Sequence, residues 1–359
     1  MFTTSIGVFV FGLLAAIAGG AVGAAIGGNY AFVLTGFCVL ASWGVFAATG
    51  NTFGLDYLAF GPFMGPHVAF AGGVAAAIYA RYRGRLGDGK DVNTPLAGIG
   101  HPDILCVGAA FGIVGYVCQI GISNIPWFGK HTDPVALTVL LSGLLARLIF
   151  GGVPGKGLFH GSLHNPELFH ENATSFPAKI KLGPNGRWLE WQEKPSQLLT
   201  IGSLFGIFAG GASLFLAANV GAYLTTRGLA NTLAAANANS FCFGISAVII
   251  LFLITNRNMP VQHHVTNIAG LAAVQFFPLL MGKTFTTYHW TYTSSWDSHT
   301  WGMATVALVI AAFFGVFTAG LGEFCARLWY DRGTSHIDPP AAAIWLGNTV
   351  VVSLATLFS

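Results

Sequence analysis

Uncharged apolar segments and short polar breaks alternate along the whole chain. No Asp, Glu, Lys or Arg occurs from Phe2 to Leu55, and none occurs from Pro195 to Thr226. Uninterrupted apolar runs of about 18 or more residues are typical of membrane-spanning helices. We expect ten spans, at about 5–27, 30–50, 65–82, 102–122 and 134–151 in the first half, and at about 198–223, 233–256, 262–282, 300–328 and 339–358 in the second half.

The polar residues that precede these spans recur in the two halves. His131, followed by Thr, Asp and Pro, is repeated 205 residues later as His336, followed by Ile, Asp and Pro. His67 and the apolar run after it are repeated 197 residues later from His264. A looser pair, 198 residues apart, joins the His101 and Asp103 segment to the Asp297 and His299 segment. A nearly constant offset with the order preserved indicates an internal duplication.

Five spans in each half predict an inverted-topology repeat, because an odd number of spans makes the second copy enter the membrane in the opposite direction. The expected fold is an all-α polytopic membrane protein with repeat 1 at 1–151 and repeat 2 at 198–359. Between them, residues 152–197 form a polar connector, in which Asn185-Gly186 predicts a small β-hairpin. This architecture is similar to that of several transporter and channel groups, including urea channels and some sodium-coupled carriers.

Composition and charge fit a membrane protein and give it an orientation. Charged residues make up 8% of the chain, against about 25% in soluble domains, and the mean hydropathy is +0.66. The net charge of +3 is too small to indicate a nucleic-acid partner. Basic residues gather in the loops after spans 3, 5 and 9, so the positive-inside rule places these loops in the cytoplasm. We therefore expect an integral protein of the cytoplasmic (inner) membrane, with 152–197 on the cytoplasmic side.

The recurring His and Asp residues are the main candidates for a functional site. Inversion assigns one group to the outer half of the membrane and another to the inner half. The outer group is His67, His131, Asp133, Asp297 and His299, and the inner group is His101, Asp103, His263, His264, His336 and Asp338. Broken segments, such as the one from Gly61 to Pro66, would move these clusters toward the middle of the membrane.

Structural roles compete with function at several of these positions. Asp133 and Asp338 each precede a Pro, which is the pattern of a helix N-cap followed by the first helical residue. Glu323 lies within a span, where a carboxylate is a functional candidate. It also lies four residues before Arg327, which is the spacing of an ion pair along one helix.

The sequence favours a transporter or channel-like facilitator for a small polar or ionic solute, with a pathway between the repeats and His residues that gate it or link it to protons. Helix N-termini favour an anion, whereas the Asp caps favour a cation. One alternative is a metal-dependent membrane enzyme, whose ligands in the connector would be His160, His164 and His170. Another is a non-catalytic subunit of a larger membrane complex. The expected partners are the lipid bilayer and a small solute. The sequence names no cofactor, and it leaves open a homo-oligomer.

Overall fold

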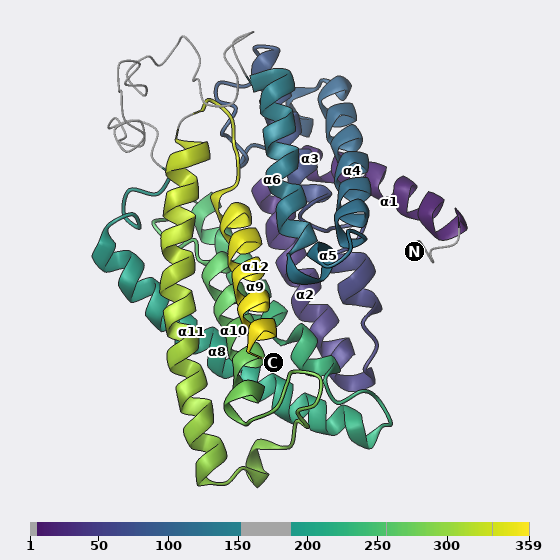
Figure 1. The fold of residues 1–359 in the computed structure, drawn as a ribbon. Coiled ribbons are helices and arrows are strands. Elements are labelled where there is room, and N and C mark those ends of the chain that lie inside the picture. The colour runs from purple at the N-terminus through teal and green to yellow at the C-terminus, as the bar shows by residue number, and fades with distance from the viewer. Residues whose placement is uncertain (1–5, 152–187, 256, 332, 359) are drawn as a thin grey trace.

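The protein is an all-α integral membrane protein. The computed structural model describes residues 6–151, 188–255, 257–331 and 333–358 (Figure 1). Within these residues, eight helices are long and apolar enough to cross a bilayer. They are α1 (Ile6–Ile26), α2 (Gly28–Thr49), α4 (Pro102–Ser123), α6 (Pro134–Ala146) continued by η3 (Arg147–Gly151), α8 (Pro195–Thr226), α9 (Leu233–Ile254), α11 (Ser298–Cys325) continued by η6 (Ala326–Tyr330), and α12 (Pro339–Leu357).

Two of the ten expected spans form helices that are not full crossings. The span expected at 65–82 forms α3 (Ala69–Tyr82), whose 14 residues reach only about 21 Å, less than the roughly 30 Å of a hydrocarbon core. The span expected at 262–282 forms α10 (His263–Leu280), which has 18 residues but is too polar to count as a candidate span. α3 starts four residues later than expected, after the Gly- and Pro-rich segment from Gly61 to Pro66, whereas α10 starts within one residue of its expected position.

Short elements connect the long ones. They are η1 (Gly54–Ala59), η2 (Leu96–Ile99), α5 (Phe128–His131) and η5 (Thr293–Ser295).

The helices pack in the same pattern in the two halves of the chain. In the first half α1 packs on α3 and α4, and in the second half α8 packs on α10 and α11. The halves join where α2 packs against α9 and where α6 packs against α12. Small residues let these backbones approach closely, as is usual in membrane bundles; the backbone of α1 at Gly20, for example, lies against that of α4 at Gly108 and Gly112.

The helices α6 and α12 lie side by side in opposite directions. The Thr132 hydroxyl, just before α6, is 3.0 Å from the hydroxyl of Thr349 in the middle of α12. Farther along α6, Gly143 lies next to His336 and Ile337, just before α12. The N-terminus of each helix therefore lies beside the middle of the other, inside the bundle rather than at its ends.

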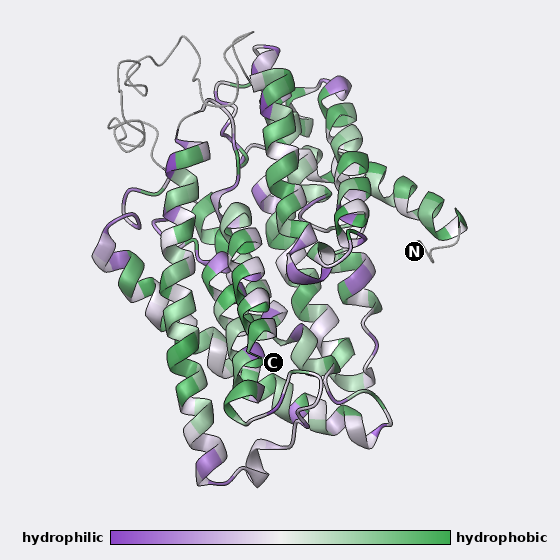
Figure 2. Ribbon diagram, viewed as in Figure 1, coloured by the Kyte–Doolittle hydropathy of each residue, from purple (hydrophilic) through white to green (hydrophobic). Residues whose placement is uncertain are grey.

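Polar residues are concentrated at the ends of the bundle and apolar residues along its sides (Figure 2). On α11, for example, Val309 and Phe313 are 66% and 65% exposed. Apolar side chains that remain exposed on long helices fit a lipid environment, because lipid tails are as apolar as they are.

Candidate functional site

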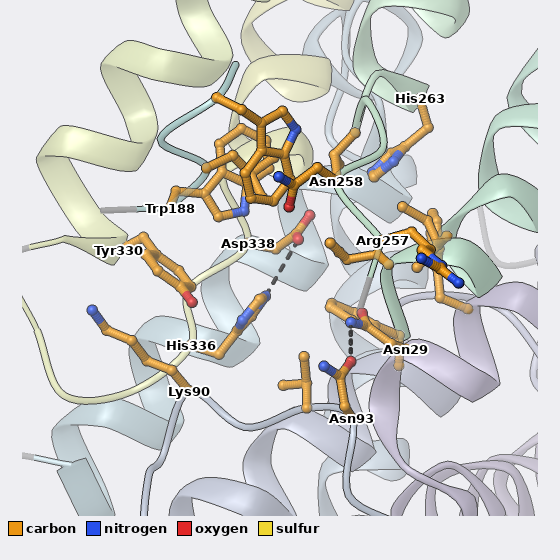
Figure 3. A pocket seen from close by; sticks show the side chains of 18 residues that line it. Asn29, Lys90, Asn93, Trp188, Arg257, Asn258, His263, Tyr330, His336 and Asp338 are labelled. Carbon is orange, nitrogen blue, oxygen red and sulfur yellow. Dashed lines mark hydrogen bonds and ion pairs between the residues drawn. The ribbon is translucent and has the colours of Figure 1, made fainter. Parts of the chain in front are cut away.

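Two cavities lie between the halves of the protein. The first, here called the loop cavity, has a volume of about 380 Å³ and is lined in part by loop residues, among them Lys90, Asn93 and His336 (Figure 3). The second, the deep cavity, has a volume of about 280 Å³ and lies among α2, α6, α9, α10 and α12. Four residues line both cavities, and we call them the neck: Phe32, Phe70, His263 and Asp338.

The two cavities follow one another along the direction in which the helices cross the bundle. On α9, Ile250 and Leu253 line the loop cavity, whereas Asn239, Ser240 and Phe243 line the deep cavity. With a rise of 1.5 Å per residue, the two sets are separated by roughly 15 Å along the helix axis. The deep cavity therefore continues from the neck toward the opposite end of the bundle.

Aromatic and polar side chains of the neck contact one another. The ring centroid of Phe32 is 4.7 Å from that of His263 and 5.7 Å from that of Phe70. Asp338 is reached by His336, whose Nε2 is 3.4 Å from Oδ1 of the carboxylate. Among the described residues, the buried Nδ1 of His263 has no hydrogen-bond partner. The residues shared by the two cavities thus provide a carboxylate, an imidazole and two phenyl rings.

The deep cavity combines an apolar wall with hydrogen-bonding groups. Phe60 and Phe243 join the two phenyl rings of the neck on its wall. Its polar residues are Thr132, Asp133, Asn239, Ser240, Asn267 and Asn348, in addition to His263 and Asp338. The side-chain amide of Asn239 donates to Oδ1 of Asn267 at 2.8 Å.

Helix starts hold the two carboxylates in place. Oδ1 of Asp133 accepts a hydrogen bond from the Ala136 amide at 2.8 Å, and Oδ2 of Asp338 accepts one from the Ala341 amide at 2.8 Å. Each amide belongs to the third residue of its helix, so the capping predicted from the Asp-Pro pairs is confirmed. The other oxygen of Asp338, Oδ1, is the one that lies 3.4 Å from Nε2 of His336.

Polar residues from distant parts of the chain border the loop cavity. The ammonium group of Lys90 lies 4.4 Å from the ring centroid of Tyr330, and Asn29 donates to Asn93 at 2.6 Å. Burial lowers the pKa of Lys90 to about 8, although the carboxylates of Asp331 and Asp88 act against this shift. Burial also raises the pKa of Asp331 to about 7, against the influence of Lys90.

A buried arginine joins α6 to the loop that carries His336 and Asp338. Arg147 is 2% exposed. Its Nε donates to the Ser335 hydroxyl and its Nη2 to the Ser335 carbonyl, both at 2.6 Å, and its Nη1 donates to the Trp329 carbonyl at 2.7 Å. These bonds tie the first half of the chain to the residues directly before the neck.

Four of the candidate residues from the sequence line the cavities. Asp133 lines the deep cavity, His336 lines the loop cavity, and His263 and Asp338 line both. The duplication thus pointed to Asp133 and Asp338 as a pair, and the structure brings both to the same cavity.

His67 and His264 are partners in the sequence repeat, but neither residue lines a cavity. Both are fully buried. His67 packs against Gly115 of α4, and His264 packs against Gly322 of α11, where a side chain on either glycine would collide with the histidine residue. At Gly115 the nearest atom is the backbone carbonyl oxygen of His67, whereas at Gly322 the nearest atoms belong to the imidazole ring of His264.

The other candidates lie away from the cavities. Exposed positions are occupied by His101, Asp297 and His299. Asp103 forms an ion pair with Arg85 at 2.7 Å, Asp297 caps α11 through the Thr300 amide, and Glu323 forms the expected pair with Arg327. His131 stacks on Trp127, with ring centroids 4.4 Å apart, so it does not share the environment of His336. Ion pairing, helix capping and ring stacking account for the placement of the carboxylates and of His131.

The connector histidines His160, His164 and His170 lie outside the described residues, as does the Asn185-Gly186 turn. Among the residues that the structure does describe, no three His, Cys, Asp or Glu side chains converge as metal ligands.

Sequence reasoning missed the aromatic part of the neck. Phe32 and Phe70 lie within apolar helices, and the chain has 30 Phe residues, so neither stands out. Lys90 was counted only as one of several basic loop residues. The Asn239 and Asn267 pair carried a weak signal, since two Asn residues in apolar helices call for a partner or a cavity.

Comparison with known proteins gives one match over nearly the whole chain. The sequence model described as "Family of unknown function (DUF7973)" matches residues 3–359. The search of curated proteins finds no match, and the search of solved structures finds none.

Proposed function

The chain belongs to the DUF7973 family, and because that description assigns no activity, we propose from the site alone that the protein is a membrane transporter or channel-like facilitator for a small polar or ionic solute. The observation that carries the proposal is the pair of cavities that meet at Phe32, Phe70, His263 and Asp338. In this proposal the cavities are two parts of one pathway, and the neck is its gate.

The placement of polar groups supports a pathway. Two carboxylates, three asparagines and a histidine with an unpartnered imidazole nitrogen line a cavity inside an apolar bundle. Burying such groups costs free energy unless they find partners. If these groups line a pathway, the polar solute and its water supply the missing partners, which explains why the polar groups are there. A pathway also explains the helix starts inside the bundle, because such starts are tolerated where they border a cavity.

The arrangement of the halves supports inverted-topology repeats. The antiparallel α6 and α12 are the fifth helices of the two proposed repeats. The short α3 and α10 are the third helices, and each starts next to the deep cavity, through Pro66 and His263 respectively. We propose five helices per repeat, of which the third does not cross the membrane by itself, with the loop cavity facing the cytoplasm.

Blocking the deep cavity tests the proposal. Val139 of α6 lines that cavity and is 5% exposed, whereas Leu141 of the same helix is 41% exposed on the outside. We expect Val139→Trp to abolish protein-mediated solute entry into proteoliposomes and Leu141→Trp to leave it unchanged. Entry is measured by stopped-flow light scattering with a panel of small neutral, cationic and anionic solutes.

Both variants are compared by gel filtration and melting temperature, so that loss of folding is recognised. Equal entry through both variants would contradict the proposal. So would a wild-type protein that admits no solute of the panel faster than protein-free liposomes do.

A further inference from the structure

We propose that the deep cavity recognises a small organic cation, whose ammonium group binds the carboxylate of Asp338 or that of Asp133 and whose apolar body packs on the phenyl rings. This inference rests on the proposed transport function and specifies its substrate class.

The two helix starts at this cavity cannot serve an anion in the usual way. Helix N-termini bind anions through the free amides of their first turn. In α12 the first two residues are Pro339 and Pro340, which have no N–H, and the third amide is taken by Asp338. In α6 the first residue is Pro134, and the third amide is taken by Asp133. Each terminus therefore presents a carboxylate to the cavity instead of donors.

The carboxylates stand near the two ends of the deep cavity. Thr132, the neighbour of Asp133, is bonded to Thr349, which lies eleven residues beyond Asp338 on α12. The rise of 1.5 Å per residue separates the two Asp residues by roughly 15 Å along the axis. A cation that leaves one carboxylate can therefore reach the other further along the proposed pathway.

An independent observation at the neck also indicates a ligand. His263 is 4% exposed, lines the cavity beside Asp338, and has no partner for Nδ1 among the described residues. A neutral imidazole has one nitrogen that accepts a hydrogen bond. An ammonium donor between Asp338 and His263 would give Nδ1 of His263 a partner and would add a charge-assisted hydrogen bond to the Asp338 carboxylate, whose oxygens can each accept a second donor.

The wall of the cavity favours an organic cation over a hydrated inorganic one. Four phenyl rings line it, those of Phe32, Phe60, Phe70 and Phe243. The face of an aromatic ring attracts a cation electrostatically, and apolar area on a ligand gains free energy when it is buried there. A volume of about 280 Å³ corresponds to roughly nine water molecules, which suits a compact amine.

The first test is binding to wild-type protein in detergent, measured by isothermal titration calorimetry. Three probes of equal length differ only in their head group: n-butylammonium, 1-butanol and butanoate. We expect n-butylammonium to bind at least about tenfold more tightly than 1-butanol, a difference of about 1.4 kcal/mol, and butanoate to bind more weakly than either. Equal binding of the three probes, or stronger binding of butanoate, would overturn the cation proposal. So would a titration with sodium chloride that gives the same binding as the titration with n-butylammonium.

The second test removes each charge and keeps each helix cap, because Asn caps a helix about as well as Asp. Asp133→Asn and Asp338→Asn should each weaken n-butylammonium binding by about tenfold or more, since a charge-assisted hydrogen bond is lost. Asp297→Asn is the matched control, because Asp297 caps α11 in the same way but lies outside both cavities. Unchanged binding in both cavity variants would overturn the assignment.

The outcomes separate this inference from the proposed function. Cation binding that depends on Asp133 and Asp338, without entry of any solute into proteoliposomes, would leave the cation site standing and refute transport. Entry of another solute that Val139→Trp blocks, without cation binding, would refute the cation site and leave transport standing.

Discussion

At the scale of single residues, burial decides how several charged groups behave. Lys90 and Asp331 come from loops far apart in the sequence, and each influences the ionisation of the other at the loop cavity. The pKa of Asp331 is raised to about 7 because burial penalises its charged form. Around neutral pH this carboxyl therefore changes its charge in the folded protein, whereas in the unfolded chain it is already ionised.

Stability should therefore depend on pH through Asp331. A pKa raised from 3.8 to about 7 means that the folded state holds a proton that the unfolded state has lost, so the stability contributed by this group declines as the pH rises from about 4 to 7. Asp331→Asn cannot ionise. At pH 8 we expect this variant to melt at a higher temperature than the wild type, by about 2–4 °C for each kcal/mol by which its free energy of unfolding is larger. At pH 4 the two melting temperatures should converge.

The measurement is a thermal unfolding series from pH 4 to pH 8 in one detergent. Asp91→Asn is the comparison, since Asp91 lies in the same region and already accepts hydrogen bonds from Asn93 and Thr94. A constant difference between Asp331→Asn and wild type at every pH would count against the raised pKa.

At the scale of elements, one buried side chain, that of Arg147, joins the C-terminal end of α6 to the loop before α12. The guanidinium of Arg147 makes three hydrogen bonds to Ser335 and Trp329, and these span more than 180 positions of the chain. The loop that it holds leads directly into His336 and Asp338. Arg147 is therefore a positioning residue for the neck, because it acts through the backbone of Ser335 and not on the cavity itself.

Arg147→Lys should destabilise the protein, because an ammonium group cannot reproduce the three fixed directions of a guanidinium. A hydrogen bond with a charged partner contributes about 1.5–3 kcal/mol, so the loss of one or two should lower the melting temperature by at least about 3 °C. Ser335→Ala removes only the bond from Nε to the hydroxyl and should have a smaller effect. A variant Arg147→Lys that melts like the wild type would show that these bonds contribute little.

The sequence predicted the long helices well and the site only in part, for physical reasons. Apolar runs determine helices such as α2 and α9, because a segment in lipid must satisfy its backbone hydrogen bonds internally. The Asp-Pro pairs identified the starts of α6 and α12 because capping is local. The neck depends on long-range packing, in which Phe32 meets His263. No local pattern separates Phe32 from other apolar residues, and none distinguishes His336 at the cavity from His131 on Trp127.

At the scale of the whole molecule, the loop after α3 and the loop after α10 lie at opposite ends of the bundle. Gly89, in the loop after α3, pairs with Ser335, just beyond the C-terminal end of α11 and η6. The loop after α10 leads into the N-terminal end of α11, at the lower end of the bundle (Figure 1). The 33 residues of that long helix span roughly 50 Å, so the two loops are separated by more than the thickness of a membrane.

Inverted-topology repeats therefore predict that these two loops lie on opposite sides of the membrane, because they follow the third helix of each repeat. Gly87 and His289 are exposed positions in the two loops, and a side chain at Gly87 would enter open space. In inside-out membrane vesicles, Gly87→Cys should react with a membrane-impermeant maleimide and His289→Cys should not, while sealed right-side-out vesicles should give the reverse. The unmodified protein, with its five native cysteines, gives the background. Labelling of both positions from the same side would rule out inverted repeats. Reversed labelling would preserve the repeats and place the loop cavity on the outer side, against the orientation that the basic loops predict.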